Sequence, residues 1–187
     1  MTCPDGMLSD MNRAQNLLAR FDLAEYRLCR LLNLGSEQLP LLRLMQGASR
    51  VGDGVVWYLL IALLPLLYGR AGVRASLAMM LTGAIGLGLY RLLKKALVRE
   101  RPFIRHPGIT LTMPPLDRYS FPSGHTLHAV CFSTQAVAQF PELGWVLVPL
   151  AALIAASRVV LGLHYPSDVL AGALLGLVLA GAGLALV

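Results

Sequence analysis

Long apolar runs alternate with short polar breaks along most of the chain. Five of these runs carry almost no charge, and each has roughly the 17 to 25 residues that a membrane-spanning helix needs. They cover residues 51–68, 75–93, 119–141, 143–163 and 166–187. The pattern predicts an all-α integral membrane helical bundle with about five transmembrane helices.

The first fifty residues have a different pattern. In residues 14–34, apolar side chains recur at helical spacing but are interrupted by Arg20, Asp22, Glu25, Arg27 and Arg30. So many charges would be costly in hydrocarbon, so we expect an amphipathic helix in the membrane interface, followed by a second one over about 39–50. A solvated helix packed on the rest of the protein is the alternative. We therefore divide the chain into an N-terminal interfacial segment, 1–50, and a single transmembrane domain, 51–187.

The composition excludes an ordinary soluble domain. The chain has 187 residues, of which 56% are hydrophobic and 14% charged, and its mean hydropathy is +0.64. The start of the chain lacks a basic stretch followed by an apolar core, so no cleaved signal peptide is expected. Cys3, Cys29 and Cys131 have neither metal-binding nor CxxC spacing, so no disulfide framework is expected.

The net charge of +6 indicates an anionic partner. The basic residues are not interleaved with aromatic ones on a soluble face, so anionic lipid or phosphate is favoured over nucleic acid. The order of the runs also places the polar loop 94–118 and the loop around His164 on the same side of the membrane. The connections at Arg70 and Glu142 lie on the other side, so the concentrated polar chemistry shares one face.

The first polar group on this face is Lys94 with Arg101 and Pro102, in KKALVRERP. Two cations seven residues apart can converge from the end of a helix and the turn that follows it, and Pro102 stops that helix. Alone, these residues equally fit a basic boundary between a helix and the lipid head groups.

The second group is Pro122, Ser123, Gly124 and His125, in FPSGHTLHAV. Serine is a favoured N-cap, and the free amides and dipole of a helix start attract an anion, which His125 would then contact. An ordinary capped helix is the alternative. His128, one turn further on, is expected to be packed or hydrogen-bonded rather than catalytic.

The third group is Arg158, His164 and Asp168, in SRVVLGLHYPSD. Asp168 can accept a hydrogen bond from one ring nitrogen of His164, which leaves the other nitrogen as a nucleophile or base. Arg158 offers a planar fork to phosphate oxygens. A structural His–Asp pair beside an interfacial arginine is the alternative.

Together the three groups resemble the tripartite signature of the type 2 phosphatidic acid phosphatase superfamily, which also includes glucose-6-phosphatase and the vanadium-dependent haloperoxidases. All eleven fixed positions of the signature match in residue type, order and spacing, between Lys94 and Asp168. Because the haloperoxidases are soluble, the apolar runs argue for a membrane lipid phosphatase.

The resemblance implies a role for each of these residues. His164 would attack the phosphorus and form a phosphohistidine, with Asp168 orienting it, while His125 would protonate the leaving oxygen and later activate water. The phosphoryl oxygens would be bound by Lys94, Arg101, Ser123, Gly124 and Arg158. With three fixed cations and no acidic cluster, we expect neither a metal nor another cofactor.

The position of these groups at the ends of apolar helices favours a lipid phosphate or diphosphate as substrate. The first choice is an isoprenyl diphosphate of the undecaprenyl type, and the second is a glycerophospholipid phosphate such as phosphatidate or phosphatidylglycerol phosphate. Head-group contacts from Arg105, His106, Asp117 and Arg118 are possible, although solvated loop residues are favoured. A non-catalytic protein that binds or transports a lipid phosphate is the alternative from another class. Beyond this substrate and the membrane lipids, the sequence predicts no partner and no oligomeric state.

The orientation in the cell membrane is the point at which two indications conflict. If residues 1–50 do not span, every lysine and arginine except Arg70 and Arg74 lies on the side of the polar groups. The positive-inside rule then turns these groups toward the cytoplasm. The family resemblance implies an inner membrane protein with an outward, periplasmic site, and we follow it.

Overall fold

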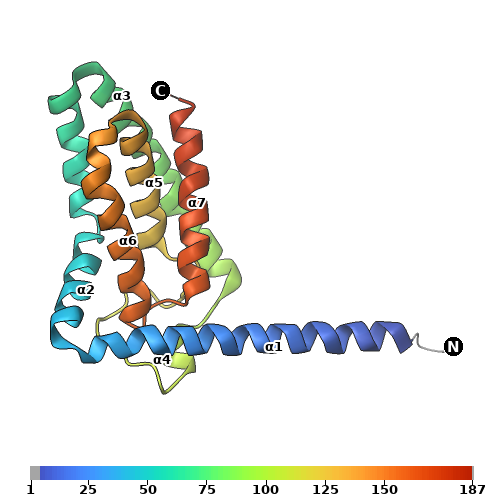
Figure 1. Cartoon of the computed structure of the whole chain (residues 1–187). Helices are drawn as coiled ribbons and strands as arrows, with labels where there is room; N and C mark the ends of the chain where they lie inside the picture. Colours follow the sequence, from blue (N-terminus) through green and yellow to red (C-terminus); the bar gives the residue numbers. More distant parts are fainter. Residues whose placement is uncertain (1–4, 187) are drawn as a thin grey trace.

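The computed structural model describes residues 5–186, and within them every regular element is a helix (Figure 1). The all-α prediction is therefore confirmed, while Cys3 lies outside the described residues. In chain order the elements are α1 (Asp5–Asn33), η1 (Leu34–Glu37), α2 (Leu39–Val51), α3 (Val55–Leu97), α4 (Pro102–Arg105), α5 (Gly124–Gln139), η2 (Pro141–Leu143), α6 (Gly144–Val160) and α7 (Pro166–Leu184).

Helix α3 folds back on itself at Gly69, so that its two arms form an antiparallel hairpin (Figure 1). Gly69 has φ 56° and ψ −128°, a conformation that a residue with a Cβ rarely adopts. Beyond the bend, a Cβ on Gly72 would lie 1.9 Å from the carbonyl oxygen of Leu64. The Ser76 hydroxyl also donates to the Ile61 carbonyl at 2.7 Å. The hairpin matches the predicted runs 51–68 and 75–93 and the turn between them.

Helix α5 lies at the centre of the bundle, against α3, α6 and α7 (Figure 1). Its approach to α7 depends on two glycines that lack a side chain. A Cβ on Gly172 would lie 2.5 Å from the Ser123 carbonyl oxygen, and one on Gly176 would lie 2.6 Å from that of Leu127. Larger residues there would separate the two helices whose N-terminal ends carry the signature residues.

Three helices of the described chain are long and apolar enough to cross a membrane. They span Val55–Arg105, Pro141–Val160 and Pro166–Leu184, and the first of them contains the bend at Gly69. Their outer faces carry large apolar side chains such as Leu66, Trp145 and Val178, each at least 70% exposed. An apolar surface of this kind fits a lipid environment.

Helix α5 is shorter than the predicted run 119–141, because it begins at Gly124 and has 16 residues. Residues 119–123 are non-helical, since Pro122 disfavours the helical conformation of the residue before it and Ser123 takes the capping position. The protein is a membrane helical bundle, and the count of five crossing helices stays a prediction.

Helix α1 runs across one end of the bundle, and α2 packs against α6 (Figure 1). The end of α1 is joined to the end of α6 by the Asn33 side chain, which donates to the Val160 carbonyl at 2.8 Å. The same side chain donates to the Thr110 carbonyl at 3.0 Å. The location of α1 in the membrane interface stays a prediction. Cys29 in α1 and Cys131 in α5 are buried free thiols.

Candidate active site

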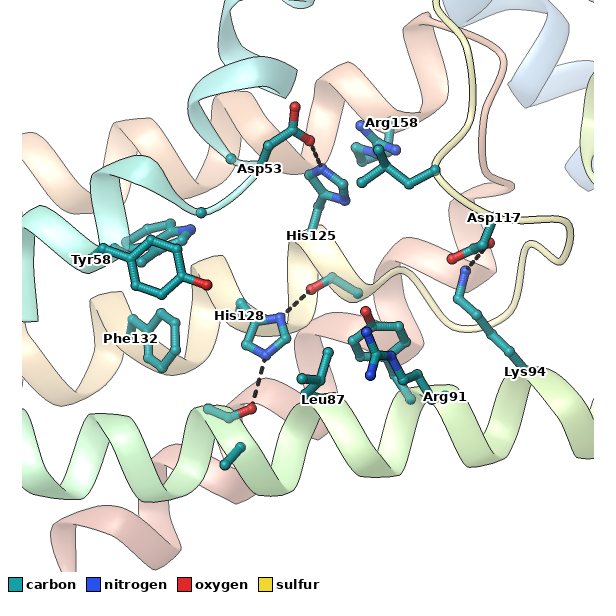
Figure 2. A pocket seen from close by; sticks show the side chains of 18 of the residues that line it. Asp53, Tyr58, Leu87, Arg91, Lys94, Asp117, His125, His128, Phe132 and Arg158 are labelled. Atoms are coloured by element: carbon teal, nitrogen blue, oxygen red, sulfur yellow. Dashed lines mark hydrogen bonds and ion pairs between the residues drawn. The ribbon is translucent and has the colours of Figure 1, made fainter.

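The three signature groups converge on one cavity of about 1130 Å³ (Figure 2). It lies between the two arms of α3 and the first half of α5, and its polar end is lined by Lys94, Arg101, Gly124, His125, Arg158 and His164. The remainder of its wall is largely apolar and includes Trp57, Ile61, Met79, Leu87 and Phe132. Signature residues separated by up to seventy positions, Lys94 to His164, therefore line the same cavity.

The start of α5 presents backbone to the cavity. Ser123 is the N-cap, and its hydroxyl accepts from the Thr126 amide at 3.5 Å and lies 2.9 Å from the Thr126 hydroxyl. Gly124 and His125 line the cavity, and the free amides at this helix start favour an anion. Ser123 is fully buried behind them, and its contact with phosphate stays a prediction.

His164 is held in the turn between α6 and α7. Gly162 makes this turn with φ +74°, and a Cβ there would lie 2.6 Å from the Thr110 carbonyl oxygen. The imidazole of His164 is 1% exposed, and its Nε2 lies 3.3 Å from Nη1 of Arg101. Its Nδ1 lies 3.6 Å from Oδ2 of Asp168, which is longer than a hydrogen bond.

The surroundings of His164 favour the neutral imidazole. Burial lowers the pKa of His164 well below its ordinary value, and the charges of Arg158, Arg101 and Lys94 lower it further. Because the arginine N–H faces Nε2, a lone pair on Nε2 and a proton on Nδ1 fit the contacts best. This is the tautomer in which Nε2 can act as a nucleophile.

Asp168 lies behind His164 and is fully buried. Its Oδ2 accepts from the Tyr165 amide at 2.8 Å, and its Oδ1 accepts from Nη1 of Arg99 at 2.6 Å. The first of these bonds belongs to the capping box of α7. The same carboxylate therefore caps the N-terminus of α7 and faces the His164 imidazole.

The three cations of the signature, Lys94, Arg101 and Arg158, line the polar end of the cavity. Arg158 is 2% exposed, contacts the Ser49 hydroxyl, and forms no ion pair within residues 5–186. A buried guanidinium without a counter-ion is costly, so this position favours a bound anion.

Lys94 and Arg101 share one carboxylate oxygen. Oδ1 of Asp117 accepts from Lys94 at 2.8 Å and from Arg101 at 2.7 Å, and the Asp117 side chain is 40% exposed (Figure 2). Burial alone would raise the pKa of Asp117, but the hydrogen bonds and charges of these two cations together lower it. Asp117 is thus an ionised carboxylate paired with the two cations that are predicted to bind phosphate.

His125 is paired with a carboxylate from the loop between α2 and α3. Its Nε2 lies 2.6 Å from Oδ1 of Asp53, and Figure 2 shows His125 between Asp53 and Arg158. The His125 and Asp53 side chains are 11% and 33% exposed, so this pair is more accessible to solvent than His164.

The PAP2 superfamily model matches residues 71–187, which is more than half of the chain. The chain belongs to the PAP2 superfamily. Among its relatives, undecaprenyl-diphosphatase BcrC from Bacillus subtilis is 33% identical over 126 residues, covering 67% of this chain and 65% of the relative. An undecaprenyl-diphosphatase from Sulfolobus acidocaldarius is 34% identical over 135 residues, covering 71% and 64%. The matched region is therefore slightly less than two thirds of each relative.

A solved PAP2 structure has the same fold. The crystal structure of a transmembrane PAP2 type phosphatidylglycerolphosphate phosphatase from Bacillus subtilis matches with a TM-score of 0.72 and 26% identity. The match covers 88% of this chain and 84% of that one. The likeness extends beyond the signature to the helical bundle that supports it.

Four charged residues in this PAP2 site contact the signature side chains or each other, and the sequence did not predict these contacts. Arg99, two positions before Arg101, donates to Asp168 and Glu25. Asp53 pairs with His125. Asp117 accepts from Lys94 and Arg101. Glu25 and Asp53 precede the family match, which begins at residue 71. Spacing could not reveal them, because each contact joins residues far apart in the sequence.

The other predictions for this PAP2 chain vary in outcome. The ring nitrogens of His128 lie 3.0 Å from the Gly124 carbonyl oxygen and 3.2 Å from that of Gly83, as expected for a hydrogen-bonded histidine. Arg118 lines the cavity, whereas Arg105 pairs with Asp22 at 3.6 Å and the His106 ring lies tilted against Tyr26, with 4.4 Å between the ring centroids. In the described part of the chain, no group of three or more His, Cys, Asp or Glu side chains could hold a metal ion.

Proposed function

We propose that this protein is a membrane phosphatase that hydrolyses a lipid phosphate or diphosphate through a phosphohistidine intermediate. The observation that carries the proposal is a buried His164 with three cations and a helix start around it, at the polar end of a largely apolar cavity. Binding alone would need the cations but not a histidine backed by a carboxylate.

In the first step, the cations and the Gly124 amide hold the phosphoryl oxygens. Nε2 of His164 attacks the phosphorus, so the P–N bond forms as the P–O bond to the leaving group breaks. Asp168 stabilises the positive charge that develops on the imidazole. His125 donates a proton to the leaving oxygen, which departs with the lipid as an alcohol or a monophosphate.

In the second step, His125 removes a proton from water. The hydroxide attacks the phosphohistidine, inorganic phosphate is released, and neutral His164 is restored. Asp53 at 2.6 Å would keep one nitrogen of His125 oriented while the other exchanges the proton. Fixed cations stabilise the transition state, and no cofactor is part of this proposal.

The apolar wall of the cavity supports a lipid substrate. The arms of α3 supply Trp57, Ile61 and Met79, against which a hydrocarbon chain could lie while its phosphate reaches His164. Because two relatives are named undecaprenyl-diphosphatase, an undecaprenyl-type diphosphate is the first choice. The phosphatidylglycerolphosphate phosphatase among the solved structures makes a glycerophospholipid phosphate the second.

A phosphate-release assay on purified protein tests this proposal. Undecaprenyl diphosphate, phosphatidylglycerol phosphate and phosphatidate would be compared for wild type and His164→Ala, each with EDTA and with orthovanadate. We expect turnover that survives EDTA, is inhibited by vanadate and is lost in His164→Ala. No phosphate release from any lipid would favour the non-catalytic binding or transport protein.

We also propose that the protein is a multi-pass inner membrane protein whose site faces the periplasm. The distribution of basic residues opposes this, because α1 and α2 lie at the end of the bundle that holds the site (Figure 1). A cysteine introduced at exposed Glu37, in a Cys3→Ser background, would be labelled from outside sealed cells by an impermeant reagent. Labelling only after permeabilisation would place the site in the cytoplasm.

A further inference from the structure

Helix α1 sends one carboxylate into the catalytic end of the bundle. Glu25 is 7% exposed, although its helix neighbour Phe21 is 57% exposed. Its Oε2 accepts from Nη2 of Arg99 at 2.5 Å, and its Oε1 accepts from the backbone amide of Ser167 at 3.0 Å. Both carboxylate oxygens of Glu25 therefore accept hydrogen bonds from residues next to the signature residues Arg101 and Asp168.

Arg99 connects this carboxylate to the proposed catalytic machinery. Its Nη1 donates to Oδ1 of Asp168 at 2.6 Å and to the Ser167 hydroxyl at 2.7 Å, while the guanidinium lies 4.1 Å from the ring centroid of Tyr165. The planar fork therefore has one arm on Glu25 and the other on Asp168.

The contacts made by Glu25 fix the part of the chain that carries Asp168. The Ser167 amide belongs to the first turn of α7, where backbone donors have no partner within the helix, and Glu25 supplies one. Glu25 also restrains Arg99, whose side chain is 24% exposed and could otherwise turn toward solvent. Asp168 is fully buried and depends on Arg99 as the cation nearest its Oδ1.

We infer that Glu25 and Arg99 are positioning residues for Asp168 and His164, so that docking of α1 completes the catalytic site. This inference rests on the proposed function, in which Asp168 supports the charge that develops on His164. Two further contacts join α1 to the same segment: the Cys29 thiol lies 3.9 Å from the His164 carbonyl oxygen, and Asn33 donates to the Val160 carbonyl.

The test is a kinetic comparison of Glu25→Gln, Arg99→Gln and the double variant in the phosphate-release assay. Glu25→Gln keeps the size of the side chain and removes its charge, and we expect kcat to fall about tenfold, as for other partners that orient a reacting group. KM should stay within about twofold, because the phosphate-binding cations are untouched. The double variant should be no slower than Arg99→Gln, since the two residues act in series.

Asp22→Asn is the matched control. Asp22 lies on the same helix and pairs with Arg105 at 3.6 Å, with both side chains 54% exposed, so its kcat should equal that of the wild type. Rates are expressed per site, counted as folded, monodisperse protein in detergent, so that a loss of folded protein does not imitate a loss of catalysis. If Glu25→Gln does not fold, Arg99→Lys, which keeps the charge but loses the fork, has the same expected result.

A wild-type kcat per site in Glu25→Gln, or in Arg99→Lys where that replaces it, would overturn the inference. So would a fall in kcat matched by Asp22→Asn, since the effect would then belong to α1 generally. The proposed function fails separately: it is wrong if His164→Ala, measured beside these variants, still releases phosphate.

Discussion

The two histidines of the site lie in contrasting surroundings. His164 is 1% exposed, touches Arg101, and has Asp168 behind it at 3.6 Å. His125 is more accessible and makes a 2.6 Å contact with Asp53, which is itself one third exposed. A nucleophile benefits from a fixed, water-free position, whereas a group that exchanges protons with water needs access to it. The contrast is consistent with the two roles proposed for these histidines.

The contrast extends to how each histidine is supported. Behind His164 a chain of charges runs from Asp168 through Arg99 to Glu25 on α1, and both carboxylates are buried. Behind His125 stands one carboxylate, held in the short loop between α2 and α3. We therefore expect the loss of His164 to abolish chemistry, and the loss of His125 to slow it.

Replacing His164 by alanine has the largest expected effect. Without Nε2 no phosphohistidine can form, so kcat should fall by at least about 10⁴-fold. Phosphate release measured over hours, at an enzyme concentration that would reveal this residual rate, gives the answer. Substantial activity in the variant would mean either that His125 is the nucleophile or that the reaction has no covalent intermediate.

Replacing His125 by alanine should lower kcat by about 10²- to 10⁴-fold, with KM nearly unchanged. An aryl phosphate sharpens the comparison, because its leaving oxygen needs no proton. With that substrate the first step should survive, and a burst of the aryl alcohol should precede slow release of phosphate. If this burst were lost together with the turnover of both substrates, His125 would not be the acid of the first step.

Replacing Asp53 by asparagine should lower kcat by about tenfold, since the amide keeps the size of the side chain but holds the wrong tautomer of His125. The acidic and basic limbs of the pH–rate profile should also move closer together. Asp22→Asn, a remote exposed carboxylate, is the control in the same assay. An unchanged pH–rate profile in Asp53→Asn would show that Asp53 does not orient His125 for proton transfer.

Replacing Asp117 by asparagine should strengthen anion binding severalfold. The carboxylate lies on Lys94 and Arg101, so removing its charge leaves both cations more available to an incoming phosphate. The inhibition constant of orthovanadate measures this without turnover. Weaker inhibition would show that Asp117 instead orients the two cations for phosphate.

The smallest expected effect is on the acidic side of the pH–rate profile. Because the pKa of His164 lies well below 6.5, the imidazole stays neutral as the pH falls from 7 to 6. After correction for substrate ionisation, kcat/KM should fall less than about twofold over this range. A tenfold fall that tracks a group of pKa 6.5 or above would show that His164 is not held neutral.

Residues close in the sequence were predictable, and contacts between distant residues were not. The motifs around Lys94, Ser123 and His164 and the turn near Gly69 follow from local patterns of charge, capping and glycine. Glu25 meets Arg99 across 74 positions and Ser167 across 142, and Asp53 meets His125 across 72. Only the packing of α1 and the α2–α3 loop brings these groups together.

The start of α5 shows a different limit. Tyr119, Phe121 and Pro122 extend the apolar run, so hydropathy places the helix start too early. In the fold, the Ser123 amide donates to the Asp168 carbonyl at 3.0 Å, and this bond joins the starts of α5 and α7. A pattern of apolar positions carries no information about a backbone contact of this kind.

The most direct test of the account is to trap the phosphoenzyme. Purified wild type and His125→Ala would be mixed with a ³²P-labelled lipid diphosphate, quenched in alkali, in which phosphohistidine survives, and mapped by peptide sequencing. We expect label on His164, and more of it in His125→Ala when a ³²P-labelled aryl phosphate replaces the lipid diphosphate. Label on any other residue, or a burst of product with no labelled protein, would contradict it.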